Sequence, residues 1–193
     1  KPKPISGVGD DGNLLDPEQL LLDGQQRLTS LYQALLSGDP VSTTDVRGKR
    51  LRRWYYIDIE RALGDEADRE DAILSVPEDR LIREDFGRVI TADYTSMIHE
   101  CTAGAFPFRL MFDEHAKVDW LLEYIGTDPD RRARWQNFQT VVLQNVTQYL
   151  VPVIKLTRAT PKEAVCTVFE KVNTGGVPLN VFELLTATFA GDA

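Results

Sequence analysis

The clearest alternation of apolar and polar positions lies between residues 24 and 37. Its apolar members fall at offsets of 0, 3, 4, 7 and 8, and they are Leu28, Leu31, Tyr32, Leu35 and Leu36. This spacing forms one face of a helix with 3.6 residues per turn. Gly38 and Pro40 follow, as is typical after a helix end. The pattern predicts an amphipathic helix over residues 24–37.

Apolar patterns further along the chain predict the remaining elements. Short runs rich in β-branched and aromatic residues predict strands at about residues 19–22, 54–59, 73–76, 106–111 and 150–156. Helical spacing predicts helices over residues 113–126, 131–149, 161–172 and 180–189. In the strand at 54–59 the alternation leaves open which face points inward. The aromatic residues of the helix over 131–149 indicate core packing rather than a base-stacking surface. Short strands followed by helices indicate an α+β protein.

The start of the first helix carries two alternative interpretations. Asp23 can act as the N-cap, and Gln26 stands three residues later in the capping-box position. Alternatively, Gly24 turns a short strand into the helix, so that free N–H groups and the positive helix end form an anion site. Arg27 lies in the first turn, where the helix dipole disfavours a cation. That unfavourable placement indicates either a phosphate ligand or a buried acid beside Arg27.

Two sequence blocks resemble a known family. Asp23-Gly24-Gln25-Gln26-Arg27, followed by Leu-Thr-Ser-Leu, is similar to the signature of the N-terminal domain of GmrSD-type modification-dependent restriction endonucleases. The block over residues 169–179, FEKVNTGGVPL, resembles a second family element, and the helix after it carries Glu183. The run at 149–156, YLVPVIKL, resembles the strand that precedes it. The middle of the chain, about residues 40–145, matches only loosely.

The resemblance implies a fold and a domain organisation. It implies a ParB/sulfiredoxin-like α+β fold, with a small mixed sheet bearing the strand–turn–helix site and a larger helical portion. We place the ParB-like portion at residues 1–112 and the helical portion with the NTGG turn at residues 113–193, within one domain. The family's usual opening segment is not found before Leu20, so the chain is expected to be a fragment.

The resemblance also implies a nucleoside triphosphate ligand, with Mg²⁺ as a possible companion. Arg27 would contact phosphate oxygens as a charge-assisted clamp, and Gly24 would let the backbone approach them. Gln25 and Gln26 would bind phosphate or a positioned water, and Asp23 would cap the helix or hold Mg²⁺ through water. The predicted catalytic residues are therefore Asp23, Gln26 and Arg27.

The second block would complete the predicted nucleotide site. Asn173 and Thr174 would supply polar contacts, and Gly175 and Gly176 would allow close approach of the backbone. Without the resemblance, a helix C-cap is the favoured interpretation of this turn. No Gly-x-x-x-x-Gly-Lys-Ser/Thr run occurs in the sequence, which excludes an ordinary P-loop enzyme.

Charge limits the interactions with nucleic acid. A net charge of −8 argues against generic DNA binding, because phosphate contacts by Lys and Arg dominate that affinity. The best local candidate is residues 47–53, RGKRLRR, which is also consistent with a solvated hairpin or loop. Any DNA contact is expected through the full-length protein. Only His99 and His115 occur, without a His-Asn-His pattern, so a nuclease domain or subunit is expected outside this chain.

The remaining chemistry is sparse. Cys101 and Cys166 lack metal-ligand spacing and are interpreted as reduced, buried thiols of a cytoplasmic protein. We predict no metal site formed by protein side chains. The longest apolar runs are far shorter than 18 residues, so no membrane span is predicted.

Two functions remain open from the sequence. The first is a nucleotide-binding, NTP-hydrolysing regulatory domain of a DNA modification-dependent restriction or phage-defence protein. The second is a non-catalytic module that binds modified DNA or a protein partner, in which the DGQQR turn serves only the structure.

Overall fold

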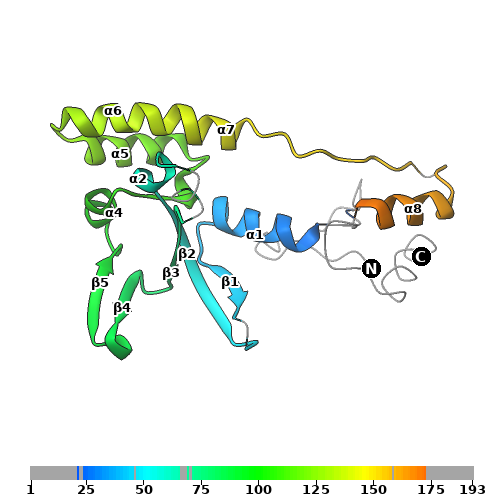
Figure 1. Cartoon of the computed structure of the whole chain (residues 1–193), viewed down its shortest axis with the longest axis horizontal. Helices are drawn as coiled ribbons and strands as arrows, with labels where there is room; N and C mark the ends of the chain where they lie inside the picture. The colour runs from blue at the N-terminus through cyan, green and yellow to red at the C-terminus, as the bar shows by residue number, and fades with distance from the viewer. Residues whose placement is uncertain are drawn as a thin grey trace. The chain divides into compact units, whose positions relative to one another are not determined.

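The computed structural model describes residues 21, 24–45, 47–65, 69, 71–157 and 159–172. Figure 1 shows the order of the elements along the chain. The helices are α1 (Gln25–Leu35), α2 (Ile59–Ala62), α4 (Met97–Ala103), α5 (Glu114–Ile125), α6 (Pro129–Phe138), α7 (Gln144–Thr147) and α8 (Lys162–Val172). The strands are β1 (Val41–Thr44), β2 (Arg50–Asp58), β3 (Ile73–Pro77), β4 (Leu81–Glu84), β5 (Val89–Asp93) and β6 (Ala105–Pro107).

The chain divides into two compact units. One contains residues 27–149 and therefore all the strands, and the other includes Gly24–Gln26 and the described residues from Leu150 onward, with α8. Within the first unit, buried residues on both sides of residue 112 pack in one cluster, including Phe106 and Trp120. The predicted division at residue 112 stays a prediction.

The long strand β2 organises the larger sheet. It pairs with β1 through Arg50–Arg53, with β3 through Arg53–Ile57 and with β6 through Tyr56–Asp58, always antiparallel. A strand residue can pair with one neighbouring strand on each side. Arg53 pairs with both β1 and β3, and Tyr56 pairs with both β3 and β6. Strands β1 and β6 therefore lie one after the other along the same side of β2, and β3 lies along the other side. Strands β4 and β5 form a separate antiparallel hairpin. The α+β prediction is confirmed. The predicted mixed sheet is not found among the described strands, because all of their pairings are antiparallel.

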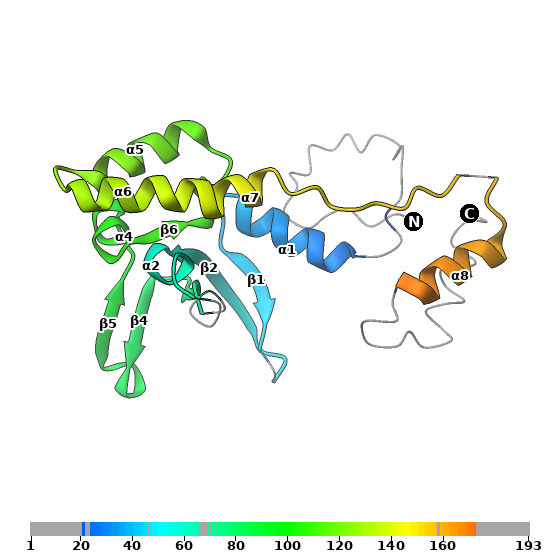
Figure 2. The ribbon, with the colours of Figure 1, turned by 45° about the horizontal axis from the view of Figure 1, so that its top comes forward.

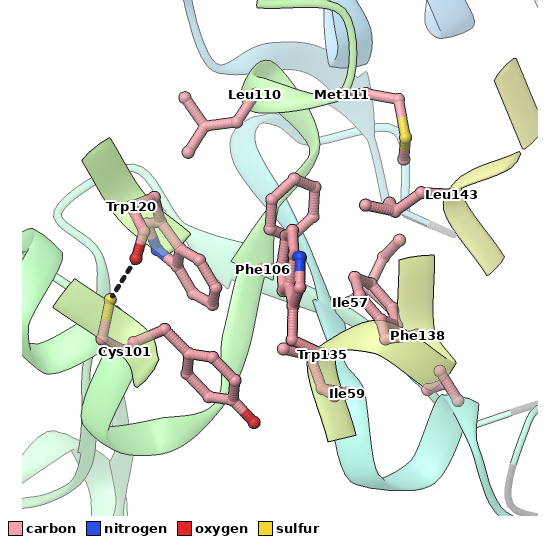
Figure 3. Close-up of a cluster of buried hydrophobic side chains, with 13 residues drawn as sticks. Ile57, Ile59, Cys101, Phe106, Leu110, Met111, Trp120, Trp135, Phe138 and Leu143 are labelled. Carbon is pink, nitrogen blue, oxygen red and sulfur yellow. Dashed lines mark hydrogen bonds between the residues drawn. The ribbon is translucent and has the colours of Figure 1, made fainter. Parts of the chain in front are cut away.

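An aromatic core lies between the sheet and the helices α5 and α6 (Figure 3). Phe106 of β6 is at its centre, with ring centroids 5.3 Å from Trp120, 5.7 Å from Trp135 and 5.7 Å from Phe138. Ile57 of β2 and Ile59 of α2 are buried in the same cluster. The predicted core role of the aromatic residues in 131–149 is therefore confirmed for Trp135 and Phe138, whereas Tyr149 is exposed.

The opposite face of β2 is also buried, by a different set of residues. Tyr56 lies in a small cluster with Val76 of β3, Tyr94 and Ala105. The rings of Tyr56 and Tyr94 stack with centroids 5.1 Å apart. Both faces of β2 are therefore used near its carboxyl end.

Local sequence signals explain the helix starts in this unit. Asp58, Ser96, Asp113 and Asp128 precede α2, α4, α5 and α6, and each side chain accepts a hydrogen bond from a backbone N–H of the first turn. Such caps satisfy donors that have no partner within the helix. Pro129 occupies the first position of α6, where its missing N–H costs nothing. The predicted helix over 113–126 matches α5 nearly to the residue. The helix predicted over 131–149 instead begins at Pro129 and runs through α6, a π-helical segment, Gln139–Leu143, and α7.

The structure corrects several predicted elements. Residues 150–156 form no strand, and Leu150, Val153 and Ile154 are exposed. The predicted strand over 106–111 ends at Pro107 and continues as a 3₁₀ turn, Phe108–Leu110. The strand predicted over 54–59 begins earlier, at Arg50, and ends at Asp58. The predicted strand over 19–22 and the helix over 180–189 lie outside the described residues, apart from Leu21, which is not in a strand.

None of the described helices combines the length and the apolarity that crossing a lipid bilayer requires.

Candidate functional site

The first motif lies at the beginning of α1. Gly24 has a φ of +79°, a left-handed conformation that side chains rarely adopt, and Gln25 is the first residue of the helix. Gln25, Gln26 and Arg27 are all exposed. The predicted turn on glycine into a helix is thus present, whereas Asp23 lies outside the described residues.

The space around this turn is open within the described structure. A Cβ atom built on Gly24 would meet no heavy atom within 4 Å. The first turn of α1 contains no acidic residue, unlike those of α2, α4, α5 and α6. The helix dipole is therefore not offset here by a carboxylate of the same turn. The side chain of Arg27 is exposed. The predicted acid beside Arg27 stays a prediction.

The second motif falls outside the described residues. Asn173, Thr174, Gly175 and Gly176 directly follow α8, which ends at Val172. Their predicted contact with the first motif stays a prediction. The helix that precedes them is confirmed over Lys162–Val172.

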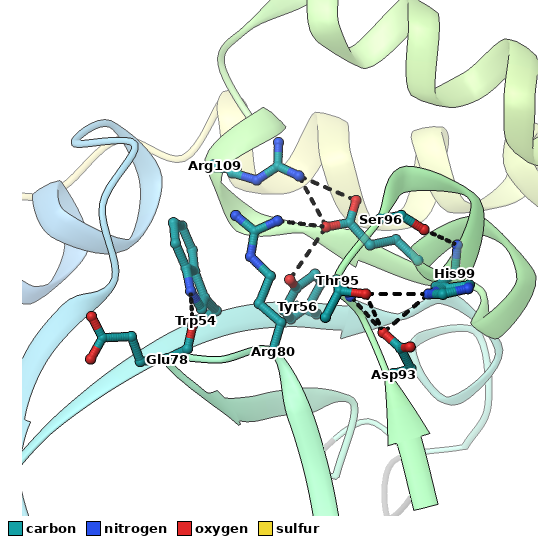
Figure 4. Close-up of polar contacts among 10 residues, drawn as sticks. Trp54, Tyr56, Glu78, Arg80, Asp93, Thr95, Ser96, His99 and Arg109 are labelled. Atoms are coloured by element: carbon teal, nitrogen blue, oxygen red, sulfur yellow. Dashed lines mark hydrogen bonds and ion pairs between the residues drawn. The ribbon is translucent and has the colours of Figure 1, made fainter. Parts of the chain in front are cut away.

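A buried ion cluster lies on the Tyr56 side of β2 (Figure 4). The carboxylate of Glu100, in α4, is completely buried. Arg109 Nη2 donates to both carboxylate oxygens, at 3.0 and 3.2 Å, and the hydroxyl of Tyr56 donates to Oε1 at 3.3 Å. Arg80 Nη1 lies 4.0 Å from Oε1, and its guanidinium stands 4.3 Å from the ring centre of Trp54.

Burial dominates the titration of this cluster. It raises the pKa of Glu100 above the usual carboxyl range, against the opposing attraction of Arg109 and Arg80. Burial, and then the neighbouring Glu100 carboxylate, raise the pKa of Tyr56. Two guanidinium groups around one carboxylate leave the cluster with surplus positive charge. No local sequence pattern indicated this site, since its members come from separate segments of the chain.

A smaller polar group joins the end of β5 to α4. Asp93 Oδ1 accepts from the Thr95 hydroxyl at 2.6 Å and lies 3.0 Å from His99 Nδ1. The hydrogen bonds from Thr95, and then the contact with His99, lower the pKa of Asp93. All three side chains reach the surface, and the group orients the turn between β5 and α4.

A cavity of about 400 Å³ lies at the start of α2, lined in part by Asp58, Arg61, Gly104, Tyr124, Arg131 and Arg134. The guanidinium of Arg131, in this lining, is hydrogen-bonded to backbone carbonyl groups. Arg131 Nη1 donates to the carbonyl oxygens of Cys101 and Tyr124, at 3.3 and 3.1 Å, in the last turns of α4 and α5. A cation at a helix C-terminus satisfies carbonyls that lack a partner within the helix. This guanidinium therefore acts as a structural link between two helix ends.

Cys101 is a structural thiol. It is buried beside Trp120, whose backbone carbonyl accepts from Sγ at 3.5 Å (Figure 3). Burial raises the pKa of the Cys101 thiol to about 12, so it stays protonated and unreactive. Cys101 is buried, as predicted, whereas Cys166 is only partly buried. Among the described residues, no three His, Cys, Asp or Glu side chains gather in a way that would hold a metal ion.

Comparison with known proteins identifies the family of this chain. The family model described as "GmrSD restriction endonuclease, N-terminal domain" matches residues 7–190. A curated relative, an uncharacterized protein of Methanocaldococcus jannaschii, is 26% identical over 183 residues. That alignment covers 91% of this chain and 28% of the relative, so the chain spans less than a third of the relative's length. No solved structure matches the chain.

Proposed function

The chain belongs to the family of GmrSD restriction endonuclease N-terminal domains, and from this premise we propose that it is a nucleotide-binding regulatory domain of a restriction or phage-defence protein. Its ligand is a nucleoside triphosphate, which it hydrolyses in the complete protein. DNA cleavage belongs to a nuclease domain or subunit outside these residues.

The exposed start of α1 is the observation that carries the proposal. Gly24 has a positive φ directly before the helix, and Arg27 stands exposed in a first turn that has no acid. Backbone N–H groups and the helix dipole attract an anion at such a position. A phosphate there would also offset the unfavourable effect of the dipole on Arg27.

Each motif residue has a role in this proposal. Arg27 pairs with phosphate oxygens, and the absence of a side chain on Gly24 leaves room for them. Gln25 and Gln26 bind phosphate or orient the attacking water. Asp23 is the carboxylate suited to Mg²⁺, which would neutralise charge on the phosphates. Phosphoryl transfer depends mainly on positioning and charge neutralisation, so this small set of groups is sufficient in principle.

Nucleotide binding to the Arg27→Ala variant tests the proposal. We expect binding of ATP or GTP, measured by calorimetry on the full chain, to weaken at least about tenfold, because charge-assisted hydrogen bonds contribute about 1.5–3 kcal/mol. The melting temperature should change little, since Arg27 is exposed. Arg27→Lys should retain part of the affinity, because the charge stays while the bidentate geometry is lost.

Arg132→Ala is the matched control. Arg132 is likewise exposed in the first turn of a helix, α6, but Asp128 already caps that helix start. Its removal should leave nucleotide binding unchanged. A large loss of stability in Arg27→Ala with nucleotide binding retained would instead favour a purely structural DGQQR turn. Triphosphate hydrolysis by the intact protein, with and without modified DNA, then tests the hydrolytic step.

A further inference from the structure

The hairpin of β1 and β2 extends beyond the rest of its sheet as a two-stranded ribbon. β1 pairs with β2 through Arg50–Arg53, but β3 joins β2 only from Arg53 onward. Over Arg50–Arg52 the sheet is therefore two strands wide. Figures 1 and 2 both show the end of this hairpin directed away from α5 and α6.

The turn of this ribbon is held by its acidic residue. Both backbone N–H groups of Arg47 and Lys49 donate to Asp45 Oδ1 at 2.9 Å. Gly48 has a φ of +77° and donates its N–H to the Asp45 carbonyl at 2.9 Å. The carboxylate thus fixes the turn, while the side chains of Arg47 and Lys49 remain exposed.

Cations dominate the end of the ribbon. Arg47, Lys49, Arg50 and Arg52 are exposed. The nearby carboxylates are Asp45, in the turn, and Glu78, which pairs with Arg52. Because side chains alternate along a strand, Arg50, Arg52 and Trp54 share one face of β2. Arg80, stacked on Trp54 at 4.3 Å, continues the basic row on that face.

We infer that this basic ribbon, Arg47–Arg52 with β1, binds duplex DNA. The major groove of B-DNA admits a two-stranded β-ribbon, and this end of the sheet has that width. Residues two apart on a strand are about 6.6 Å apart, so Arg50 and Arg52 can face successive phosphates of the closely spaced backbone charges. The chain as a whole carries a charge of −8, which would repel DNA from most other approaches.

The inference does not depend on the nucleotide site. The ribbon consists of β1 and Arg47–Arg52, which are separate in sequence from the DGQQR motif. It would contact DNA rather than a triphosphate. The narrow two-stranded form favours duplex DNA over an acidic protein partner, which would not require that width.

Replacing three cations at once tests the inference. In the full chain carrying Lys49→Gln, Arg50→Gln and Arg52→Gln, we expect affinity for a labelled DNA duplex to fall at least tenfold at low salt, measured by fluorescence anisotropy. The slope of log affinity against log salt should become shallower by roughly 0.9 for each phosphate contact removed. Nucleotide binding and the melting temperature of the triple variant should be unchanged.

A charge-matched control removes three exposed cations elsewhere, by Arg132→Gln, Lys155→Gln and Lys162→Gln. This variant should bind the duplex like the unmodified chain. An equal loss of affinity in both triple variants would overturn the inference, as would failure of the unmodified chain to bind the duplex at low salt. Displacement of the duplex by polyglutamate at equal charge concentration would assign the ribbon to an acidic protein partner instead.

Discussion

The two faces of β2 are both buried near its carboxyl end, but they are stabilised in different ways. On one face, Ile57 packs into an aromatic core in which Phe106 contacts three further rings. On the other, Tyr56 packs on Tyr94 and donates to the buried carboxylate of Glu100. Apolar burial contributes in proportion to the area removed from water. The effect of a buried charge on stability instead depends on whether an opposite charge and hydrogen-bond donors surround it.

The largest expected effect is on the aromatic face. Phe106→Ala should lower the free energy of unfolding by about 3–5 kcal/mol, because it removes a fully buried ring from the centre of the cluster. Urea unfolding measures the change. Phe86→Ala is the control, since Phe86 stands fully exposed at the tip of the β4–β5 hairpin. Equal losses in the two variants would contradict the placement of Phe106 in the core.

On the charged face, removing one partner of the buried pair should cost more stability than removing both charges. Arg109→Ala leaves the Glu100 carboxylate buried with only Arg80, at 4.0 Å, and Tyr56 as partners. We expect a loss of about 2–3 kcal/mol, below the roughly 3–5 kcal/mol seen when a fully buried pair is broken. Adding Glu100→Gln to Arg109→Ala should recover part of the loss, because the buried charge is then gone. Urea unfolding of both variants measures this, and no recovery would contradict a penalty due to the unpaired carboxylate.

The raised pKa of Glu100 predicts that stability depends on pH, with a smaller effect than the substitutions above. Its pKa is raised in the folded state, so the folded protein binds this proton more tightly than the unfolded chain. The stability contributed by this group is therefore complete below the ordinary carboxyl pKa of 4.5 and is lost as pH rises toward the folded pKa. The stability of the unmodified chain relative to Glu100→Gln should fall across that window. Unfolding curves measured from about pH 4 to about pH 7 test it, and a rising difference would contradict it.

The smallest effect should come from the exposed pair at the edge of the charged face. Arg52 and Glu78 pair across β2 and β3, with side chains 47% and 55% exposed. A double-mutant cycle of Arg52→Gln and Glu78→Gln should give a coupling of about 0–1 kcal/mol that vanishes in high salt. A coupling energy for Arg52 and Glu78 as large as the loss in Arg109→Ala would contradict the expectation that exposed ion pairs contribute less to stability than buried ones.

Several elements could be predicted because their signals are local. Asp113 before α5 and Asp128-Pro129 before α6 are capping signals, and α1 shows a regular apolar spacing. The strand predicted over 150–156 is wrong because a strand also depends on a non-local partner. Its composition favours a strand, but a strand needs a partner, and the residues of this run are without regular secondary structure. The hairpin of β4 and β5 was missed because its polar and apolar residues alternate weakly.

The candidate sites divide in the same way. The glycine turn before Arg27 was predicted from five adjacent residues and is present. The cluster around Glu100 was not predicted, because Tyr56, Arg80 and Arg109 come from separate parts of the chain. Nothing in the residues around Glu100 distinguishes it from an ordinary surface acid in a helix.

The sequence by itself determined the family, the capped helix α5, the capped start of α6 and the turn into α1, since each depends on residues within a few positions of one another. Only the tertiary structure decided which face of β2 meets aromatic rings and which meets a carboxylate, and that the basic residues 47–52 form the end of a two-stranded ribbon. The physical reason is that burial and charge pairing depend on which distant segments meet, and local spacing along the chain does not specify that.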